Sequence, residues 1–329
     1  MMRLFRFLAV GLLALAAFAA PTSAQRQTDP LRGLDVYIEK ARQNWNVAGL
    51  AVAIVKGDSV IYAKGFGFKD ISKSDPVDER TRFAIGSNSK SFTVVALGML
   101  QDEGKLQLDD RMMQYLPEFA MSDPYITREL TVRDLVTHRS GFFRGDAVWM
   151  GSGFSKDEIL RRTLHQPAAT SFRSAFGYNN IMFLAAGQIV DKVSGMSWDD
   201  FMKRRIFAPL GMTTSNTSAN DQTGPDVARP HALVDGKPVP INYRNIDNVG
   251  PAGSINANVL DMAQYIRFHL RDGKYRGTQL LSKRFQDEME TAQMISGSGR
   301  DPLLPMVHFD TYGLGFWLRD YYGKLLVSH

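Results

Sequence analysis

Cysteine is absent from the sequence. A chain without cysteine forms no disulfide and carries no lipidated cysteine, so a lipoprotein anchor is excluded. The H-E-x-x-H motif is also missing, and the six histidines show no metal-ligand spacing. There is no low-complexity tract, heptad array or repeat of fixed period. We therefore expect a globular protein that needs no disulfide, no metal and no other cofactor.

Basic residues are not concentrated in any segment that would indicate a nucleic-acid surface. The formal net charge of the whole chain is only +5. Short clusters such as Lys203-Arg204-Arg205 lie on one face of an expected helix. Because nucleic-acid-binding proteins gather their positive charge in larger patches, we expect no nucleic-acid partner.

The first residues have the pattern of a secretory signal. Arg3 and Arg6 precede an apolar run from Phe7 to Ala20, and the small-residue stretch PTSA follows. This pattern predicts cleavage after Ala24 and export to the periplasm or the cell exterior. The apolar run is too short to cross a bilayer comfortably, so we expect no stable membrane span after cleavage. An uncleaved membrane anchor is the alternative.

Hydrophobic periodicity divides the remaining chain into a strand-rich start, a long helical middle and a strand-rich end. A helix is expected over 34–45 and a β-hairpin over 50–55 and 60–67. In the helical middle, capping-box patterns begin at Thr131, Ser155 and Ser197, and two further helices are expected at 181–195 and 258–273. Long connections rich in proline and glycine are expected at 209–230 and 235–254, and the strand pattern returns only at 312–329.

This order of elements predicts an α+β fold, in which an antiparallel sheet flanked by helices contains an inserted all-helical subdomain. The sheet part would comprise residues 30–82 and 300–329, and the mainly helical part residues 83–299. Both parts belong to one expected mature domain, 25–329. A ligand site is expected in the cleft between the two parts.

A serine and a lysine lie one helical turn apart at the start of an apolar helix. In FAIGSNSKSFTVVALGMLQDEGK, residues 83–105, Ser87 and Lys90 precede an apolar stripe at helical spacing: Phe92, Val95, Ala96, Met99 and Leu100. Free backbone N–H groups and the helix dipole would stabilise an oxyanion beside Ser87. A buried lysine with a lowered pKa could accept the serine proton. On spacing alone, the alternative is a serine cap with a surface lysine.

Three stretches together resemble the serine β-lactamase and penicillin-binding protein superfamily. Residues 83–117 are similar to its active-site helix, and LTVRDLVTHRSG (130–141) is similar to its threonine-histidine-serine-glycine stretch. Residues 176–212, which begin FGYNNIMFLAAGQIV, resemble its tyrosine-x-asparagine motif and the helices that follow. The likeness runs from about Leu34 to His329 and favours the class C-like branch, with its esterases and D-amino-acid peptidases. It implies an acyl-enzyme on Ser87.

Tyr-x-Asn occurs twice, at Tyr178–Asn180 and at Tyr243–Asn245. The first copy opens directly onto an apolar helix, which is a firm platform for a catalytic group, whereas the second lies in a proline-rich loop. By the resemblance, Tyr178 is the general base or proton relay, and Asn180 holds the substrate's amide carbonyl. A tyrosine packed at a helix start is the alternative. His138, in VTHRSG, is expected to be a structural turn residue.

The superfamily's third motif, a basic residue followed by x-Gly on a late strand, is expected at the end of the chain. The stretch YGLGFWLRDYYGKLLVSH (312–329) leads to His329, which the resemblance assigns to substrate binding in a histidine-glycine variant of the motif. Because His329 is the last residue, we expect further strands to follow it. The given chain would then be a fragment with an open, apolar sheet edge.

Missing motifs narrow the expected reaction. The α/β-hydrolase signature G-x-S-x-G is absent. A histidine at the third motif weakens the case for an efficient β-lactamase, because a lysine there would pair with the ligand's carboxylate. The sequence therefore predicts a secreted serine hydrolase for D-amino-acid peptides, esters or β-lactams, with a small acyl substrate or a cell-wall-derived peptide as its partner. The alternative is a non-catalytic, penicillin-binding-like sensor.

Overall fold

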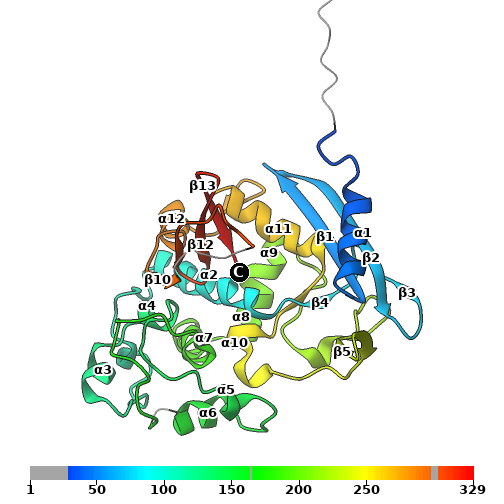
Figure 1. The fold of residues 1–329 in the computed structure, drawn as a ribbon. Helices are drawn as coiled ribbons and strands as arrows, with labels where there is room; N and C mark the ends of the chain where they lie inside the picture. The colour runs from blue at the N-terminus through cyan, green and yellow to red at the C-terminus, as the bar shows by residue number, and fades with distance from the viewer. Residues whose placement is uncertain (1–28, 164, 298–302) are drawn as a thin grey trace, which may run out of the picture.

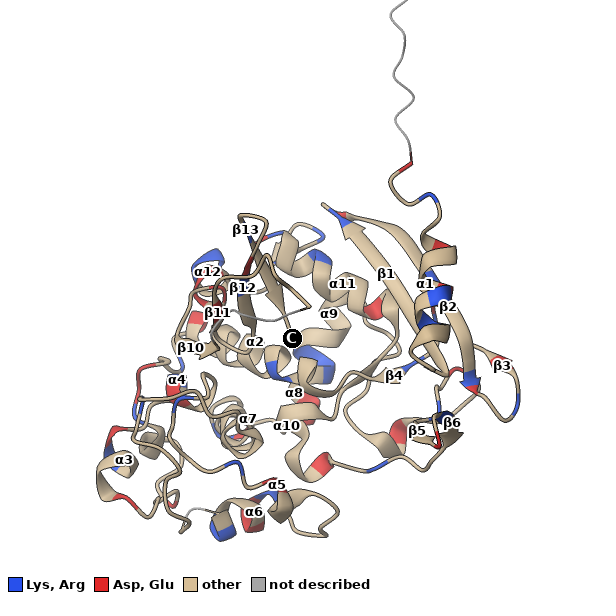
Figure 2. Cartoon of the chain, viewed as in Figure 1, with Lys and Arg blue, Asp and Glu red and all other residues tan. Residues whose placement is uncertain are grey.

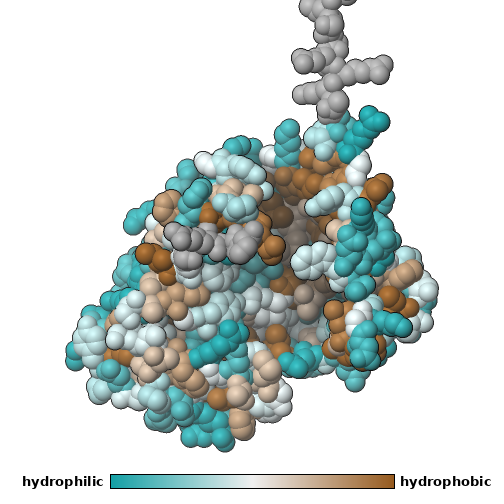
Figure 3. Space-filling model, in the orientation of Figure 1, coloured by the Kyte–Doolittle hydropathy of each residue, from teal (hydrophilic) through white to brown (hydrophobic). Residues whose placement is uncertain are grey.

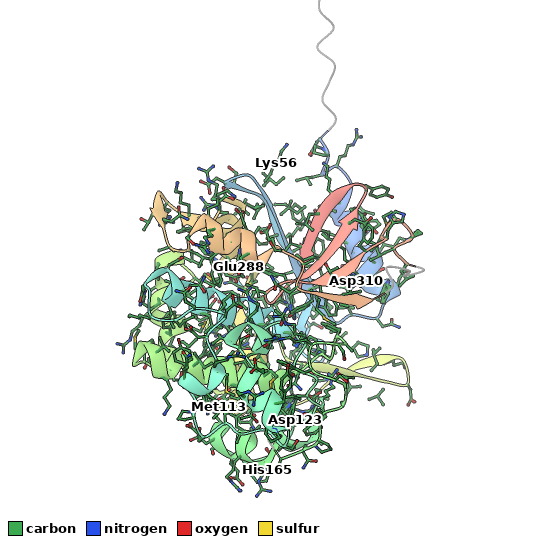
Figure 4. The ribbon with its side chains drawn as sticks, turned by 90° about the vertical axis from the view of Figure 1, so that its left-hand side faces the viewer. Lys56, Met113, Asp123, His165, Glu288 and Asp310 are labelled. Atoms are coloured by element: carbon green, nitrogen blue, oxygen red, sulfur yellow. The ribbon has the colours of Figure 1, made fainter. Side chains whose placement is uncertain are left out.

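The computed structural model describes residues 29–163, 165–297 and 303–329. The predicted signal peptide and its cleavage site lie outside these residues. Figure 1 shows a strand-rich part, which contains both the early hairpin and the C-terminal strands, above a part made of helices and loops. The view turned by 90° places Lys56 and Asp310 in the strand-rich part and Met113, Asp123 and His165 in the helical part (Figure 4). The α+β class predicted from the sequence is confirmed.

The first elements are a helix and a three-stranded antiparallel sheet. Helix α1 (Leu34–Asn44) precedes strands β1 (Gly49–Lys56), β2 (Ser59–Asp70) and β3 (Asp75–Pro76), which pair in that order. The Tyr62 hydroxyl donates a hydrogen bond of 2.6 Å to the Asp35 carboxylate, which joins β2 to α1. The predicted helix and hairpin are both confirmed.

The C-terminal strands form a second antiparallel sheet. Its strands, in spatial order, are β10 (Met294–Gly297), β11 (Asp310–Tyr312), β12 (Trp317–Tyr321) and β13 (Lys324–Ser328). Within the described ranges, none of these strands pairs with β1–β3. The single sheet expected from the sequence is therefore two sheets here, and the second begins before residue 300. Strand β10 is short and has the sequence MISG, so it gave little strand signal.

Helices joined by long loops and three short strand pairs make up the chain between the two sheets. The α-helices are α2 (Ser89–Asp102), α3 (Pro124–Glu129), α4 (Val132–Leu135), α5 (Asp146–Trp149), α6 (Lys156–Thr163), α7 (Asn180–Ser194), α8 (Trp198–Phe201), α9 (Ala208–Leu210), α10 (Gly250–Gly253), α11 (Val259–Leu270) and α12 (Lys283–Met289). Shorter turns are the 3-10 segments η1 (Gly86–Asn88), η2 (Met112–Gln114), η4 (Ala219–Asp221) and η5 (Asp247–Val249), and the π-helical η3 (Met202–Phe207). Two-stranded pairs are β4 (Phe83–Ala84) with β7 (Asn256–Ala257), β5 (His231–Val234) with β6 (Lys237–Pro240), and β8 (Lys274–Tyr275) with β9 (Thr278–Gln279).

Helix α2 is the central element of the core. Every residue from Ser89 to Leu100 is buried, so the apolar stripe expected from the sequence was too narrow a description. The ring of Phe92 stacks on Tyr265 of α11 at 3.7 Å between centroids. A helix that is apolar on all sides must be covered on all sides. The start of α2 is thereby held rigidly in the middle of the molecule.

The predicted capping signals differ in how completely they form. Thr131 and Asp134 make a full capping box at α4. Ser155 and Ser197 each accept one backbone N–H, from Glu158 and Asp200, and so act as plain serine caps.

The expected connection 235–254 also contains structure that the sequence prediction missed. Strands β5 and β6 are joined by Asp235 and Gly236, which have φ angles of 49° and 74°. Asp-Gly is a strong hairpin-turn signal because both residues tolerate positive φ. Helix α10, which follows later in the same stretch, packs against α2 and α7.

Lys and Arg are interspersed with Asp and Glu in the part of the chain that the structure describes (Figure 2). None of the helices in the described ranges is long and apolar enough to cross a bilayer. On the face shown in Figure 3, a hollow with hydrophobic walls lies between the C-terminal sheet and the β1–β2 hairpin.

Candidate active site

Ser87 lies in the 3-10 turn η1, directly before the first turn of α2. Strand β4 leads into this turn and pairs with β7, and the Ile85 N–H donates to the Ile255 carbonyl at 3.0 Å. The Ser89 hydroxyl donates to the Gly86 carbonyl and accepts the Ile255 N–H. Ser87 is partly exposed, whereas the helix behind it is buried. The predicted position of Ser87 at a helix N-terminus is confirmed.

The predicted catalytic residues come together at the Ser87 hydroxyl. Lys90 Nζ lies 3.0 Å from Ser87 Oγ, and Tyr178 Oη lies 2.7 Å from the same atom. His329 Nε2 lies 3.4 Å from Tyr178 Oη. The alternative of a surface lysine is wrong, because Lys90 is fully buried.

Lys90 is held by acceptors from three elements. Besides Ser87, Nζ contacts Asn180 Oδ1 of α7 at 2.8 Å and the Ala252 carbonyl of α10 at 2.7 Å. The rings of Tyr178 and Phe183 lie 4.7 and 5.4 Å from Nζ. Burial lowers the pKa of Lys90 to about 7, with Asp146 acting to raise it and Arg144 to lower it. A large share of Lys90 is therefore neutral at neutral pH.

Tyr178 remains a protonated phenol at neutral pH. Burial raises its pKa above the ordinary value, while the hydrogen bond with Ser87 and the charge of Arg144 only partly oppose that effect. The ring lies 4.3 Å from the His138 ring and 5.6 Å from the Arg144 guanidinium carbon. A phenol held at 2.7 Å from Ser87 is suited to relay a proton rather than to act as an ionised base.

Asn180 is placed by the start of α7. The preceding residue, Asn179, caps this helix by accepting the N–H groups of Ile181 and Met182. The Asn180 amide is buried, with its oxygen toward Lys90 and its nitrogen 3.0 Å from Asp146 Oδ1. One of the two N–H groups of the Asn180 amide therefore already donates a hydrogen bond to Asp146.

His138 has the structural role expected from the sequence. It is fully buried with a φ of 56°, and its Nδ1 accepts the Asn179 N–H at 3.0 Å. Burial holds its pKa well below the ordinary value, with Lys90 adding to the effect, so the ring is neutral. His138 thus supports the Asn179 cap and the Tyr178 ring.

His329 is brought to the site, as predicted. Its Nδ1 lies 2.6 Å from the Gly315 carbonyl, and because a carbonyl only accepts, Nδ1 carries the proton. Burial lowers the pKa of His329 to about 4. The ring is therefore neutral at pH 7 and offers a hydrogen bond, not a charge.

The second Tyr-x-Asn copy does not belong to the site. Tyr243 donates to the Ala228 carbonyl and accepts from Gln222, and Asn245 contacts Asp247. These contacts fasten a surface loop. The choice of Tyr178 over Tyr243 is supported by this geometry.

Three groups at the site were not found from the sequence: Asp146, Arg144 and the Ala252 carbonyl. Asp146 is far from Asn180 in the chain, and no spacing rule connects them. A backbone carbonyl carries no sequence signal at all. Among the described residues, no cluster of three or more His, Cys, Asp or Glu could hold a metal ion.

The chain is similar to known proteins over most of its length. The family model described as Beta-lactamase matches residues 34–329. Unguisins hydrolase from Aspergillus campestris is 26% identical over 89% of this chain and 55% of its own length. Penicillin-binding protein 4 from Amycolatopsis lactamdurans is 30% identical over 73% of this chain and 64% of its own length. The chain thus spans less than two thirds of either relative.

A solved structure agrees with the observed fold. The penicillin-binding protein homologue from Pyrococcus abyssi is 27% identical, with a TM-score of 0.76, and the match covers 92% of this chain and 68% of that one. Its agreement extends over both the strand-rich and the helical parts, because so little of the chain is left outside the match.

Proposed function

Because the chain belongs to the beta-lactamase family of serine hydrolases, we propose that it hydrolyses small acyl substrates through an acyl-enzyme on Ser87. One observation carries this proposal: a buried lysine and a protonated tyrosine both contact the same serine hydroxyl. A serine alone is too weak a nucleophile at neutral pH and needs an adjacent base.

The contacts of Lys90 favour a role as that base. A neutral amine has two N–H donors and one lone pair. Asn180 Oδ1 and the Ala252 carbonyl can only accept, so they take the two N–H groups. The lone pair is then directed at the third neighbour, the Ser87 hydroxyl, 3.0 Å away.

The proposed reaction forms an acyl-enzyme and then hydrolyses it. Lys90 takes the Ser87 proton while Oγ forms a bond to the acyl carbon. Tyr178 donates its proton to the leaving nitrogen or oxygen as the carbon–leaving-group bond breaks, and its own proton is restored from the Lys90 ammonium. Water then attacks the acyl-enzyme, and the same groups return the proton to Ser87.

Two features bear on the substrate class: the neutral His329 ring at the third motif and the beta-lactamase family of the chain. We propose D-amino-acid peptides, esters or β-lactams as candidate substrates. We also propose that the protein acts in the periplasm or outside the cell. One relative is named a hydrolase, which supports hydrolysis, and another is named a penicillin-binding protein, which supports binding of a β-lactam. The neutral His329 ring provides no cation for a substrate carboxylate, which disfavours efficient β-lactam turnover.

Turnover of an activated ester by the purified protein tests the proposal. We expect a burst followed by steady hydrolysis, and a kcat/KM that rises with pH through about 7 as Lys90 loses its proton. Stoichiometric labelling without turnover would instead favour the non-catalytic sensor. Hydrolysis that persists unchanged in Ser87→Ala would contradict the proposal.

A further inference from the structure

Asp146 lies at the start of α5, where it contacts Asn180 rather than Ser87. We propose that Asp146 is a positioning residue, which fixes the orientation of the Asn180 amide and so directs the Lys90 lone pair at Ser87. This inference rests on the proposed function and deepens it.

The contacts of Asp146 define its role. Its Oδ1 accepts from Asn180 Nδ2 and from Trp149 Nε1, each at 3.0 Å. Its Oδ2 pairs with Arg144 Nε at 2.5 Å. The carboxylate is mostly buried, at 17% side-chain exposure, whereas Arg144 is 64% exposed. The Asp146 carboxylate is thereby held in one place from two sides.

An amide can face Lys90 with either its oxygen or its nitrogen, and the two orientations have opposite consequences. Asp146 Oδ1 accepts from the NH₂ end of Asn180, which leaves the amide oxygen for Lys90. In the flipped amide, the NH₂ group would donate to the neutral lysine and occupy its lone pair. Lys90 could then no longer accept the Ser87 proton.

The charge of Asp146 also acts on Lys90 directly. The titratable and charged groups around Lys90 in the described ranges are Tyr178, His138, His329, Arg144 and Asp146. The first three are neutral at pH 7 for the reasons given above. Arg144 and Asp146 therefore form an opposed pair, in which Asp146 favours the ammonium and Arg144 the neutral amine.

The opposed pair gives a test in which two variants move in opposite directions. Asp146→Asn removes the charge that favours the ammonium, so the pKa of Lys90 should fall below its value of about 7. Arg144→Gln removes the opposing charge, so the pKa should rise. The readout is an NMR titration of ¹³C-labelled lysine side chains, with the Lys90 signal assigned by its loss in Lys90→Ala. This measurement needs no enzymatic activity.

Kinetics provide the second readout. In Asp146→Asn the acid limb of kcat/KM should move to lower pH. In Asp146→Ala, which removes the acceptor for the Asn180 amide nitrogen, the plateau value of kcat/KM should fall roughly 10²-fold. The matched control is Asp157→Asn on α6, where the carboxylate accepts a hydrogen bond from the Gln188 amide. That variant should leave both readouts at their wild-type values.

The outcomes separate this inference from the proposed function. A plateau unchanged in Asp146→Ala would overturn the positioning role even if the ester is turned over. Titrations of Asp146→Asn and Arg144→Gln that both coincide with wild type would overturn the direct effect of the charge pair on Lys90. A wild-type protein that does not hydrolyse the ester, together with opposite shifts in the two variants, would overturn the function and retain the geometry. Because the Arg144 side chain is exposed, Arg144→Gln should still fold and give a Lys90 titration even if the Asp146 variants fold poorly.

Discussion

At the scale of single residues, Lys90 and Lys105 carry the same charge but differ in environment. Lys90 is fully buried beside Ser87, whereas Lys105 lies beyond α2 and pairs with Glu103 at 2.8 Å. We predict that Lys90→Ala lowers kcat/KM by roughly 10²–10⁴, the usual loss for a general base. Lys105→Ala should change it little. Equal activity of the two variants in an ester assay would refute the assignment of Lys90.

The two tyrosines of the Tyr-x-Asn copies make a second residue-scale comparison. Tyr178→Phe removes a hydroxyl that contacts Ser87, so turnover should slow while the fold remains. Tyr243→Phe removes a hydrogen bond to the Ala228 carbonyl, so it should cost about 1 kcal/mol of unfolding free energy and leave turnover intact. Kinetics and chemical denaturation of both variants measure these effects. The reverse pattern would place the motif at 243–245.

At the scale of elements, the contact between α7 and α10 supports the lysine site. A Cβ added at Gly187 of α7 would lie 2.7 Å from Cβ of Pro251, next to the Ala252 carbonyl that binds Lys90. We predict that Gly187→Ala lowers the free energy of unfolding by about 1–3 kcal/mol and also reduces turnover. Gly153→Ala, where the added Cβ meets no atom within 4 Å, is the control. An unfolding free energy equal to wild type in Gly187→Ala would contradict the prediction, because α10 would then shift without loss of stability.

Elements with local signals were predictable from the sequence. The hairpin β1–β2, the helices α1, α2, α7 and α11, and the Thr131 capping box all follow from periodicity and caps within a few residues. The separation into two sheets was not predictable, because strand pairing depends on contacts far apart in the chain. Asp146 was also not predictable, because its partner Asn180 lies on another helix, far away in the chain. Ser87, Lys90 and Tyr178 were found because motif spacing and resemblance identified them before any geometry.

At the scale of the whole molecule, export remains a prediction, because residues 1–28 lie outside the described ranges. The basic start, apolar run and small-residue exit predict a mature chain that begins at Gln25. Expression of the natural gene in a bacterial host, followed by cell fractionation and intact-mass measurement, checks this. A full-length chain that stays in the cytoplasm would contradict it.

The central claim for the whole molecule is that its chemistry passes through Ser87. The most direct measurement is intact-mass analysis and peptide mapping after reaction with a fluorophosphonate or penicillin-type probe. The wild-type protein should gain one probe-derived adduct on the peptide that contains Ser87, and Ser87→Ala should gain none, because Lys90 and Tyr178 both contact the Ser87 hydroxyl. Undiminished labelling of Ser87→Ala would show that another residue is the nucleophile.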